Sequence, residues 1–145
     1  MDIMKKIVII NGPNLNLLGR REPQIYGTET WEDTFKGLCI QFPEIYLDDF
    51  QSNHEGDIID HIQKSGFDKE MAGIVINPGA LAHYSYAVAD AIAAVPAPVV
   101  EVHISNIMAR EEHRRRSVTA ASCLAMIAGA GRAGYSLAIQ LLLNR

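Results

Sequence analysis

The sequence predicts an α/β fold built on a parallel sheet. Five short apolar runs, most of them rich in β-branched residues, alternate with stretches that have helical periodicity. Parallel neighbours in a sheet need crossover connections, which are usually helices, so this alternation is typical of a doubly wound sheet. The chain has 145 residues, of which 48% are hydrophobic. That size fits one domain with a core of its own, and we expect residues 1–145 to form a single domain.

The predicted elements follow one another with clear start and stop signals. The first strand, residues 6–10, is a β-branched run closed by Asn-Gly-Pro, and further strands are expected at 45–50, 73–76, 99–103 and 124–128. Thr30, with Asp33 three residues later, resembles a capping box and opens a helix over 31–42. The other predicted helices are one that carries Ile58, Ile59 and Ile62 on one face and stops at Gly66, one near 85–95 and one over 133–143.

These elements predict a flavodoxin-like sheet with strand order 2-1-3-4-5. Ligands of such sheets bind beyond the carboxyl ends of the strands, near the point between strands 1 and 3 where the winding reverses. Polar residues follow strands 1, 3 and 4 at this edge: Asn11, Asn14, Arg21 and Tyr26; Asn77, Gly79 and His83; Glu101, His103, Ser105 and Asn106. These side chains, distant in sequence, are therefore expected to converge on one crevice.

Two features of this edge indicate chemistry. The loop over 11–27 is long and polar, which is uncommon in a compact domain unless the loop is a lid or a binding loop. It carries Arg21 and Tyr26, and a nearby cation favours tyrosinate over tyrosine. Glu101 and His103 are two apart on one strand and share a face, so the carboxylate can orient or charge the imidazole.

Several functional classes are not favoured. A net charge of −4 gives no reason to expect a nucleic-acid partner, and no stretch is long enough to cross a membrane. Two cysteines without redox or metal spacing suit a cytoplasmic protein, and the five histidines show no zinc-site spacing. The run over 129–134 matches the G-x-G-x-x-G pattern of dinucleotide sites, but too few residues follow it to supply the acidic ribose ligand. Glycines for a tight turn and close helix packing explain that run better.

Three long motifs then follow one family in order. They read NGPNLNLLGRREPxxYG at 11–27, NPGAxxHxS at 77–85 and EVHISNxxAREExRRxS at 101–117, and a GxGxxGYxLA element comes near the end. The chain resembles the type II 3-dehydroquinate dehydratases over nearly its whole length. The resemblance implies a flavodoxin-like fold, no metal or other cofactor, and dehydration of 3-dehydroquinate to 3-dehydroshikimate. It also implies a homo-oligomer in which trimers form a dodecamer.

The resemblance also implies a role for individual residues. Tyr26 would take a proton from the carbon next to the substrate ketone. A free tyrosine is ionised in only roughly one molecule in a thousand at neutral pH, so Arg21 and Arg110 are the expected cationic neighbours. Asn14 would stabilise the enolate, through a bound water, and His103, oriented by Glu101, would protonate the departing hydroxyl. Substrate binding would fall to Asn77, His83, Asp90, Ile104, Ser105 and Arg114.

Some alternatives stay open. Arg110 and Arg114 could lie on a solvated helical face, and Asp90 could be an exposed helix residue. The family pattern is broken at Leu81, Ala82, Tyr84 and His113, which could alter the pocket. A flavodoxin-like binding or assembly module without turnover is an alternative function, although no proposed proton-transfer group is missing. A lysine Schiff base is not favoured, because no lysine follows a strand at the active edge.

Two expectations concern assembly and motion. The segment over 137–143 is apolar nearly all round, which suits a helix that is buried on more than one side, either in an oligomer or in the core of one subunit. The loop over 15–26 is expected to close on a ligand and to bring Arg21 into the site.

Overall fold

The computed structural model describes residues 4–145, and in this part of the chain five parallel strands form one sheet. The strand order is β2-β1-β3-β4-β5, which confirms the predicted topology and the flavodoxin-like fold. The strands are β1 (Lys5–Asn11), β2 (Ile45–Gln51), β3 (Met71–Asn77), β4 (Val99–His103) and β5 (Ala125–Ala128). Among the described residues, no helix has the length and apolar content required to cross a bilayer.

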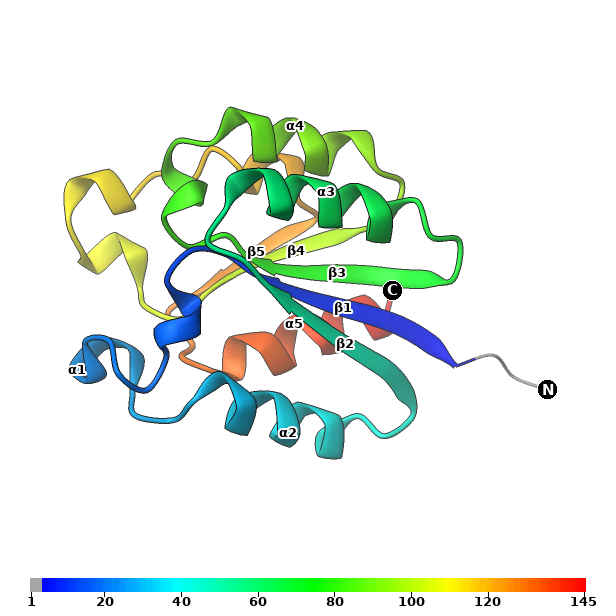
Figure 1. The fold of residues 1–145 in the computed structure, drawn as a ribbon, viewed down its shortest axis with the longest axis horizontal. Coiled ribbons are helices and arrows are strands. Elements are labelled where there is room, and N and C mark those ends of the chain that lie inside the picture. Colours follow the sequence, from blue (N-terminus) through cyan, green and yellow to red (C-terminus); the bar gives the residue numbers. More distant parts are fainter. Residues whose placement is uncertain (1–3) are drawn as a thin grey trace.

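The main helices pack on both faces of the sheet. Helices α3 (Glu55–Gly66) and α4 (Tyr86–Ala94) cover one face, and α2 (Trp31–Gln41) and α5 (Ala133–Leu143) cover the other (Figure 1). Short helical turns occupy the loops at the carboxyl edge: η1 (Leu15–Leu17), α1 (Pro23–Tyr26), η2 (Gly79–His83), η3 (Ile107–Ala109), η4 (Glu112–Arg114) and η5 (Ala120–Ser122). The segment over 11–27, which the sequence predicts as a long polar loop, contains the two short helical turns η1 and α1.

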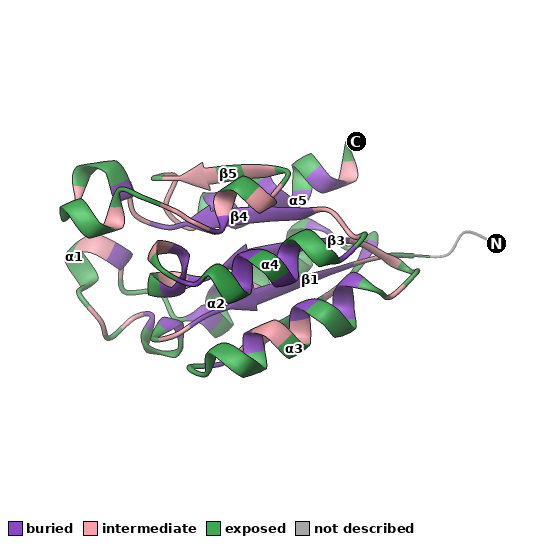
Figure 2. Ribbon diagram, turned by 90° about the horizontal axis from the view of Figure 1, so that it is seen from above, coloured by how far each residue is buried: buried purple, intermediate pink, exposed green. Residues whose placement is uncertain are grey.

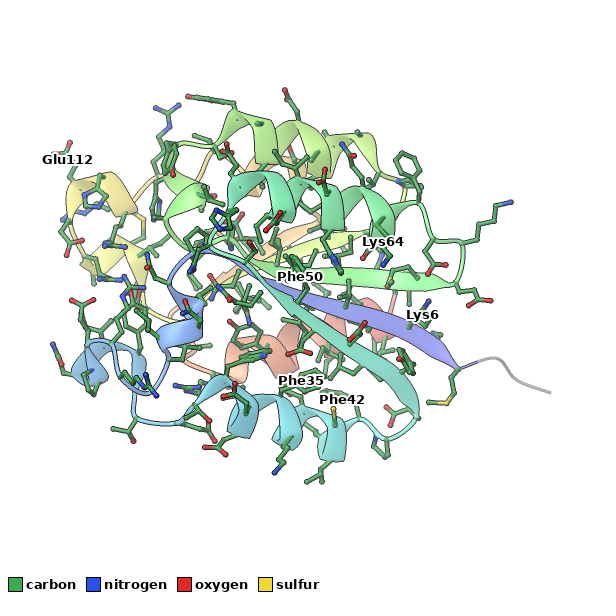
Figure 3. The ribbon with its side chains drawn as sticks, in the orientation of Figure 1. Lys6, Phe35, Phe42, Phe50, Lys64 and Glu112 are labelled. Atoms are coloured by element: carbon green, nitrogen blue, oxygen red, sulfur yellow. The ribbon has the colours of Figure 1, made fainter. Side chains whose placement is uncertain are left out.

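The core follows from the alternation of side chains along the strands. In β1, Ile7 and Ile9 belong to the apolar cluster on the α2 and α5 side, whereas Val8 and Ile10 belong to the cluster on the α3 and α4 side. All four are essentially inaccessible, so this strand is apolar on both faces, as expected for a central parallel strand. The central strands are buried and the outer helix faces exposed (Figure 2). Phe42 lies on the α2 side of the sheet and Phe50 on the α3 side (Figure 3).

Helix ends match their local sequence signals. The hydroxyl of Thr30 accepts a hydrogen bond from the backbone N–H of Asp33 at 3.2 Å, which confirms the predicted start of α2.

Helix α5 spans the predicted residues, but it is not buried all round. Tyr135 and Ile139 are inaccessible, whereas Leu137 and Leu141 are 44% and 38% exposed.

The loops after β1 and β3 meet at the point where the winding reverses. Asn11 and Asn77 are paired in register at the ends of these strands, and the backbone N–H of Gly12 donates to the Asn77 carbonyl at 2.8 Å. A Cβ atom at Gly12 would lie 2.5 Å from the carbonyl oxygen of Pro78. Glycine is therefore required for the close approach that fixes this corner of the edge.

Candidate active site

A small cavity opens at the carboxyl edge of the sheet. Eight of the residues that the sequence nominated line it: Tyr26, Asn77, His83, His103, Ile104, Ser105, Arg110 and Arg114. They come from the segments after β1 and β3 and from the end of β4 with the turns that follow it. The topology thus brings most of the nominated side chains together, as the position of the reversal point predicts.

Tyr26 is held in this cavity by two arginines. It ends α1 and is 8% exposed. Arg110 Nη1 donates a hydrogen bond to the phenol oxygen at 2.5 Å, and the Arg21 guanidinium carbon lies 4.6 Å from the centre of the Tyr26 ring. Tyr26 thus has a charged hydrogen-bond donor at its oxygen and a second cation near its ring.

Glu22 is an unforeseen member of this group. Its carboxylate lies 3.6 Å from Arg21 Nε and 3.9 Å from Arg110 Nη2, so it offsets the repulsion between the two cations. The backbone of Glu22 has φ of +36°, a left-handed conformation that side chains other than glycine rarely adopt. The motif contains this glutamate, but no sequence signal indicates its conformation.

Arg132 fixes the backbone around Tyr26. Its Nη2 donates to the Tyr26 carbonyl at 3.1 Å and to the carbonyl of Glu29, and its Nη1 donates to the Thr34 hydroxyl at 2.7 Å. Arg132 lies in the glycine-rich run over 129–134. Two glycines of that run, Gly129 and Gly131, have φ of +85° and +62°, which fits their assignment as turn residues.

His103 and Glu101 form a buried pair. The two side chains share a face of β4, and His103 Nε2 lies 2.8 Å from Glu101 Oε2. Ser117 donates a hydrogen bond to the same oxygen at 2.7 Å, and Thr119 donates to Oε1. Burial raises the pKa of Glu101, but the hydrogen bonds from His103, Ser117 and Thr119 outweigh it and leave the pKa below its ordinary value.

The ionised state of Glu101 determines which nitrogen of His103 is free. A carboxylate only accepts hydrogen bonds, so His103 Nε2 carries a proton and donates it, and Nδ1 is left for a ligand. Thr119 and Ser117 were missed as members of the site, although Ser117 closes the third sequence motif. Their contact with Glu101 crosses from the loop after η4 to β4, and local spacing does not reveal such a contact.

His83 is the second histidine of the cavity. Its Nδ1 lies 2.7 Å from the carbonyl oxygen of Arg116, which only accepts, so Nδ1 carries the proton. Burial lowers the pKa of His83; this backbone hydrogen bond opposes the shift, and the charges of His103, Arg114 and His113 add to it. His83 is therefore neutral at pH 7, with Nε2 available as an acceptor.

Four nominated residues lie outside the cavity lining. Arg21 and Glu101 contact Tyr26 and His103, which line it, whereas Asn14 and Asp90 are exposed. Asn14 is exposed at the start of η1 with φ of +70°, and its backbone N–H donates to Asn53 Oδ1 at 2.9 Å. Asp90 is exposed on α4. Arg110 and Arg114 do not share a continuous solvated helix, because η3 ends at Ala109 and η4 spans Glu112–Arg114, and both arginines line the cavity.

The four departures from the family pattern are not among the residues that line the cavity. Leu81 and Ala82 are buried, and Leu81 packs in the core cluster under α3 and α4. Tyr84 is 63% exposed, and the His113 ring stands edge-on to the His83 ring with their centres 6.2 Å apart. Among residues 4–145, no three His, Cys, Asp or Glu side chains converge in a way that suits a metal ion.

Comparison with known proteins decides the family. The family model described as Dehydroquinase class II matches residues 5–143. The chain belongs to the class II dehydroquinases. It is 54% identical over 138 residues to the 3-dehydroquinate dehydratase of Caldicellulosiruptor bescii, covering 94% of each chain. It is 51% identical over 143 residues to that of Halothermothrix orenii, covering 97% of this chain and 95% of the relative.

Solved structures agree with this membership of the class II dehydroquinases. The type II dehydroquinase of Butyrivibrio crossotus superposes with a TM-score of 0.93 at 49% identity, covering 97% of this chain and 98% of that one. A 3-dehydroquinate dehydratase-like protein of Bifidobacterium longum has a TM-score of 0.68 at 30% identity, covering 98% and 100% of the two chains. The activity of this chain is accordingly that of a 3-dehydroquinate dehydratase, a hydro-lyase of the shikimate pathway.

Proposed function

We propose that the cavity at the carboxyl edge is where this dehydratase eliminates water from 3-dehydroquinate, through an enolate, to form 3-dehydroshikimate. The observation that supports it best is the pair of proton-transfer groups on one cavity. Tyr26 is bonded to Arg110, and His103 is bonded to Glu101. One group is arranged to carry negative charge and the other to carry positive charge, as a base and an acid require.

Tyr26 is the base in this proposal. As tyrosinate it takes the proton from the carbon next to the ketone, and the electron pair of the broken C–H bond moves into the enolate. Arg110, hydrogen-bonded to the phenol oxygen at 2.5 Å, and the nearby Arg21 guanidinium are the two cations beside this base. Removing either cation should therefore slow this step.

His103 is the acid. Because Nε2 is engaged by Glu101, the proton for the leaving hydroxyl comes from Nδ1. The carbon–oxygen bond breaks, the hydroxyl takes that proton and leaves as water, and the enolate electrons form the new double bond. The Glu101 carboxylate stabilises the imidazolium that precedes this step.

The remaining roles concern the enolate and the substrate. We assign stabilisation of the enolate oxygen to Asn14, through a water molecule; this role rests on the family motif, because the Asn14 side chain lies outside the cavity lining. His83 Nε2 is suited to accept from a substrate hydroxyl, and Arg114 to hold the carboxylate. The other proposed contacts are made by Asn77, Ile104, Ser105 and Asp90. The role of Asp90 rests on the resemblance alone.

Assembly and location complete the proposal. We propose that residues 1–145 form one catalytic domain and that the chain assembles into trimers and then a dodecamer. The exposed face of α5 with Leu137 and Leu141 supports a partner there. Light scattering that gives a mass near the 16.0 kDa of one chain would contradict the assembly. The cytoplasm is the proposed compartment, because Cys39 and Cys123 are both free.

A direct assay tests the proposed function. The purified chain is mixed with 3-dehydroquinate, and the ultraviolet absorbance of the conjugated enone product is followed. We expect absorbance to rise in proportion to enzyme concentration. No rise with folded protein at micromolar concentration would reject the assignment and favour a binding or assembly module without turnover.

A further inference from the structure

Tyr135 is a buried polar residue next to the cavity for which the proposed mechanism has no use. It lies on α5 and is fully inaccessible. Its hydroxyl accepts a hydrogen bond from Asn77 Nδ2 at 2.9 Å and donates one to Asn11 Oδ1 at 2.9 Å. Asn11 and Asn77 end β1 and β3, so Tyr135 bridges the two strands at the reversal point.

The three residues Asn77, Tyr135 and Asn11 form a chain of hydrogen bonds, which we call the relay, and the direction of donation along it is fixed. Burial raises the pKa of Tyr135 well above its ordinary value, although the Asn77 hydrogen bond and the charge of Arg132 oppose the shift. The hydroxyl therefore keeps its proton and donates it to Asn11. The ring is held by Trp31, whose ring centre lies 4.9 Å away. Asn11 takes part through Oδ1, which accepts the hydrogen bond from the Tyr135 hydroxyl. Within residues 4–145, its Nδ2 has no hydrogen-bond partner.

The relay determines what Asn77 can offer to a ligand. Asn77 Oδ1 accepts from the backbone N–H of Gly79 at 3.1 Å, and one hydrogen of Nδ2 goes to Tyr135. A flipped amide would place Nδ2 against the N–H of Gly79, donor against donor, and would place Oδ1 against a hydroxyl whose proton is committed to Asn11. The amide is thus held in one orientation, with one N–H of Nδ2 remaining.

We propose that Tyr135 is a positioning residue that holds the Asn77 amide so that its remaining N–H donates to an oxygen of the bound substrate. This inference rests on the proposed function of the cavity, which Asn77 lines. It assigns a site role to a residue of the last helix, far in sequence from the three motifs. It also predicts that Tyr135 affects substrate affinity more than the chemical step.

Tyr135→Phe tests the proposal, because it removes the hydroxyl and keeps the ring. We expect KM to rise about tenfold and kcat to change less than about threefold, as for loss of one oriented hydrogen bond. Asn77→Ala should raise KM by at least as much. The double variant should show no further increase, because both changes remove the same interaction.

Trp31→Phe is the control for purely structural effects. It loosens the packing of the Tyr135 ring but leaves the hydroxyl, so Tm should fall while KM stays near that of the wild type. Should Tyr135→Phe not fold, Asn11→Ala removes the acceptor at the other end of the relay, and KM should rise about threefold.

The outcomes separate the two proposals. A wild-type chain without dehydration rejects the proposed function of the cavity. If the wild type is active, an unchanged KM in folded Tyr135→Phe rejects only the role of Tyr135. If Tyr135→Phe does not fold, an unchanged KM in folded Asn11→Ala rejects that role. Additive increases in KM for Tyr135→Phe and Asn77→Ala would also overturn it, since independent effects mean that Tyr135 does not act through Asn77.

Discussion

Replacing Tyr26 with phenylalanine separates chemistry from packing at the proposed base. The change removes one oxygen and keeps the ring, so turnover should fall by at least about 10² to 10⁴ while substrate binding survives. The structure also sets the stability cost. Arg110, whose side chain is 10% exposed, loses its partner at 2.5 Å but keeps the Ser105 hydroxyl at 3.3 Å. We expect a loss of about 1.5 kcal/mol and a fall in Tm of about 5 °C.

The assay compares this variant with a matched control. Tyr46→Phe removes the same oxygen from a tyrosine that is 56% exposed on β2, remote from the cavity, and should keep wild-type turnover. Enone absorbance measures turnover, calorimetric titration measures binding, and thermal unfolding measures Tm. Tyr26→Phe with turnover within tenfold of wild type would mean that the tyrosine is structural and that another group is the base.

Three further predictions address the acid, the loop and the pH dependence of stability. His103→Ala should abolish dehydration yet still exchange the substrate α-hydrogen with deuterated solvent, which Tyr26→Phe should not do; mass spectrometry distinguishes them, and the absence of exchange in His103→Ala would argue against a separate acid. Trypsin should cut after Arg20 or Arg21 in the free protein and more slowly with a saturating substrate analogue, whereas equal rates would count against a closing loop. The lowered pKa of Glu101 means that its ionised form adds stability above its ordinary pKa of 4.5 and that this contribution is lost as the pH falls through the lowered value. In chemical denaturation from pH 3 to 7, the free energy of unfolding of Glu101→Gln should fall less steeply toward acid than that of wild type. Parallel curves of unfolding free energy against pH would disprove the linkage.

The fold was predictable because local signals and the global arrangement agree. The apolar run before Asn11 and the Thr30 cap are local patterns, and both appear in the structure as expected. The strand order followed from the need to connect parallel strands through helices. The sequence predicts that β3 ends at Ile76, whereas the strand extends to Asn77, because a buried polar residue at a strand end looks in the sequence like the start of a loop.

The site was only partly predictable, since its supporting contacts are not local. The convergence of Tyr26 with His103 followed from topology and the family motifs. The hydrogen bonds of Thr119 to Glu101 and of Tyr135 to Asn77 join segments 18 and 58 residues apart, and no spacing rule reveals them. The left-handed backbone of Glu22 was equally hidden, because glutamate does not favour it.

The hydrogen bonds that Arg132 donates to the backbone at Tyr26 divide the loop over 11–27 into a fixed part and a free part. The hydrogen bonds of Arg132 tie the Tyr26 carbonyl and Thr34 to the start of α5, and the hydrogen bond from the Gly12 N–H to the Asn77 carbonyl ties the beginning of the loop to β3. Arg21 lies between these two anchors. Any opening of the loop therefore moves a charge relative to a stationary phenol. When the loop closes, the base would then stay in place, and its reactivity would change because the charge of Arg21 comes closer to it.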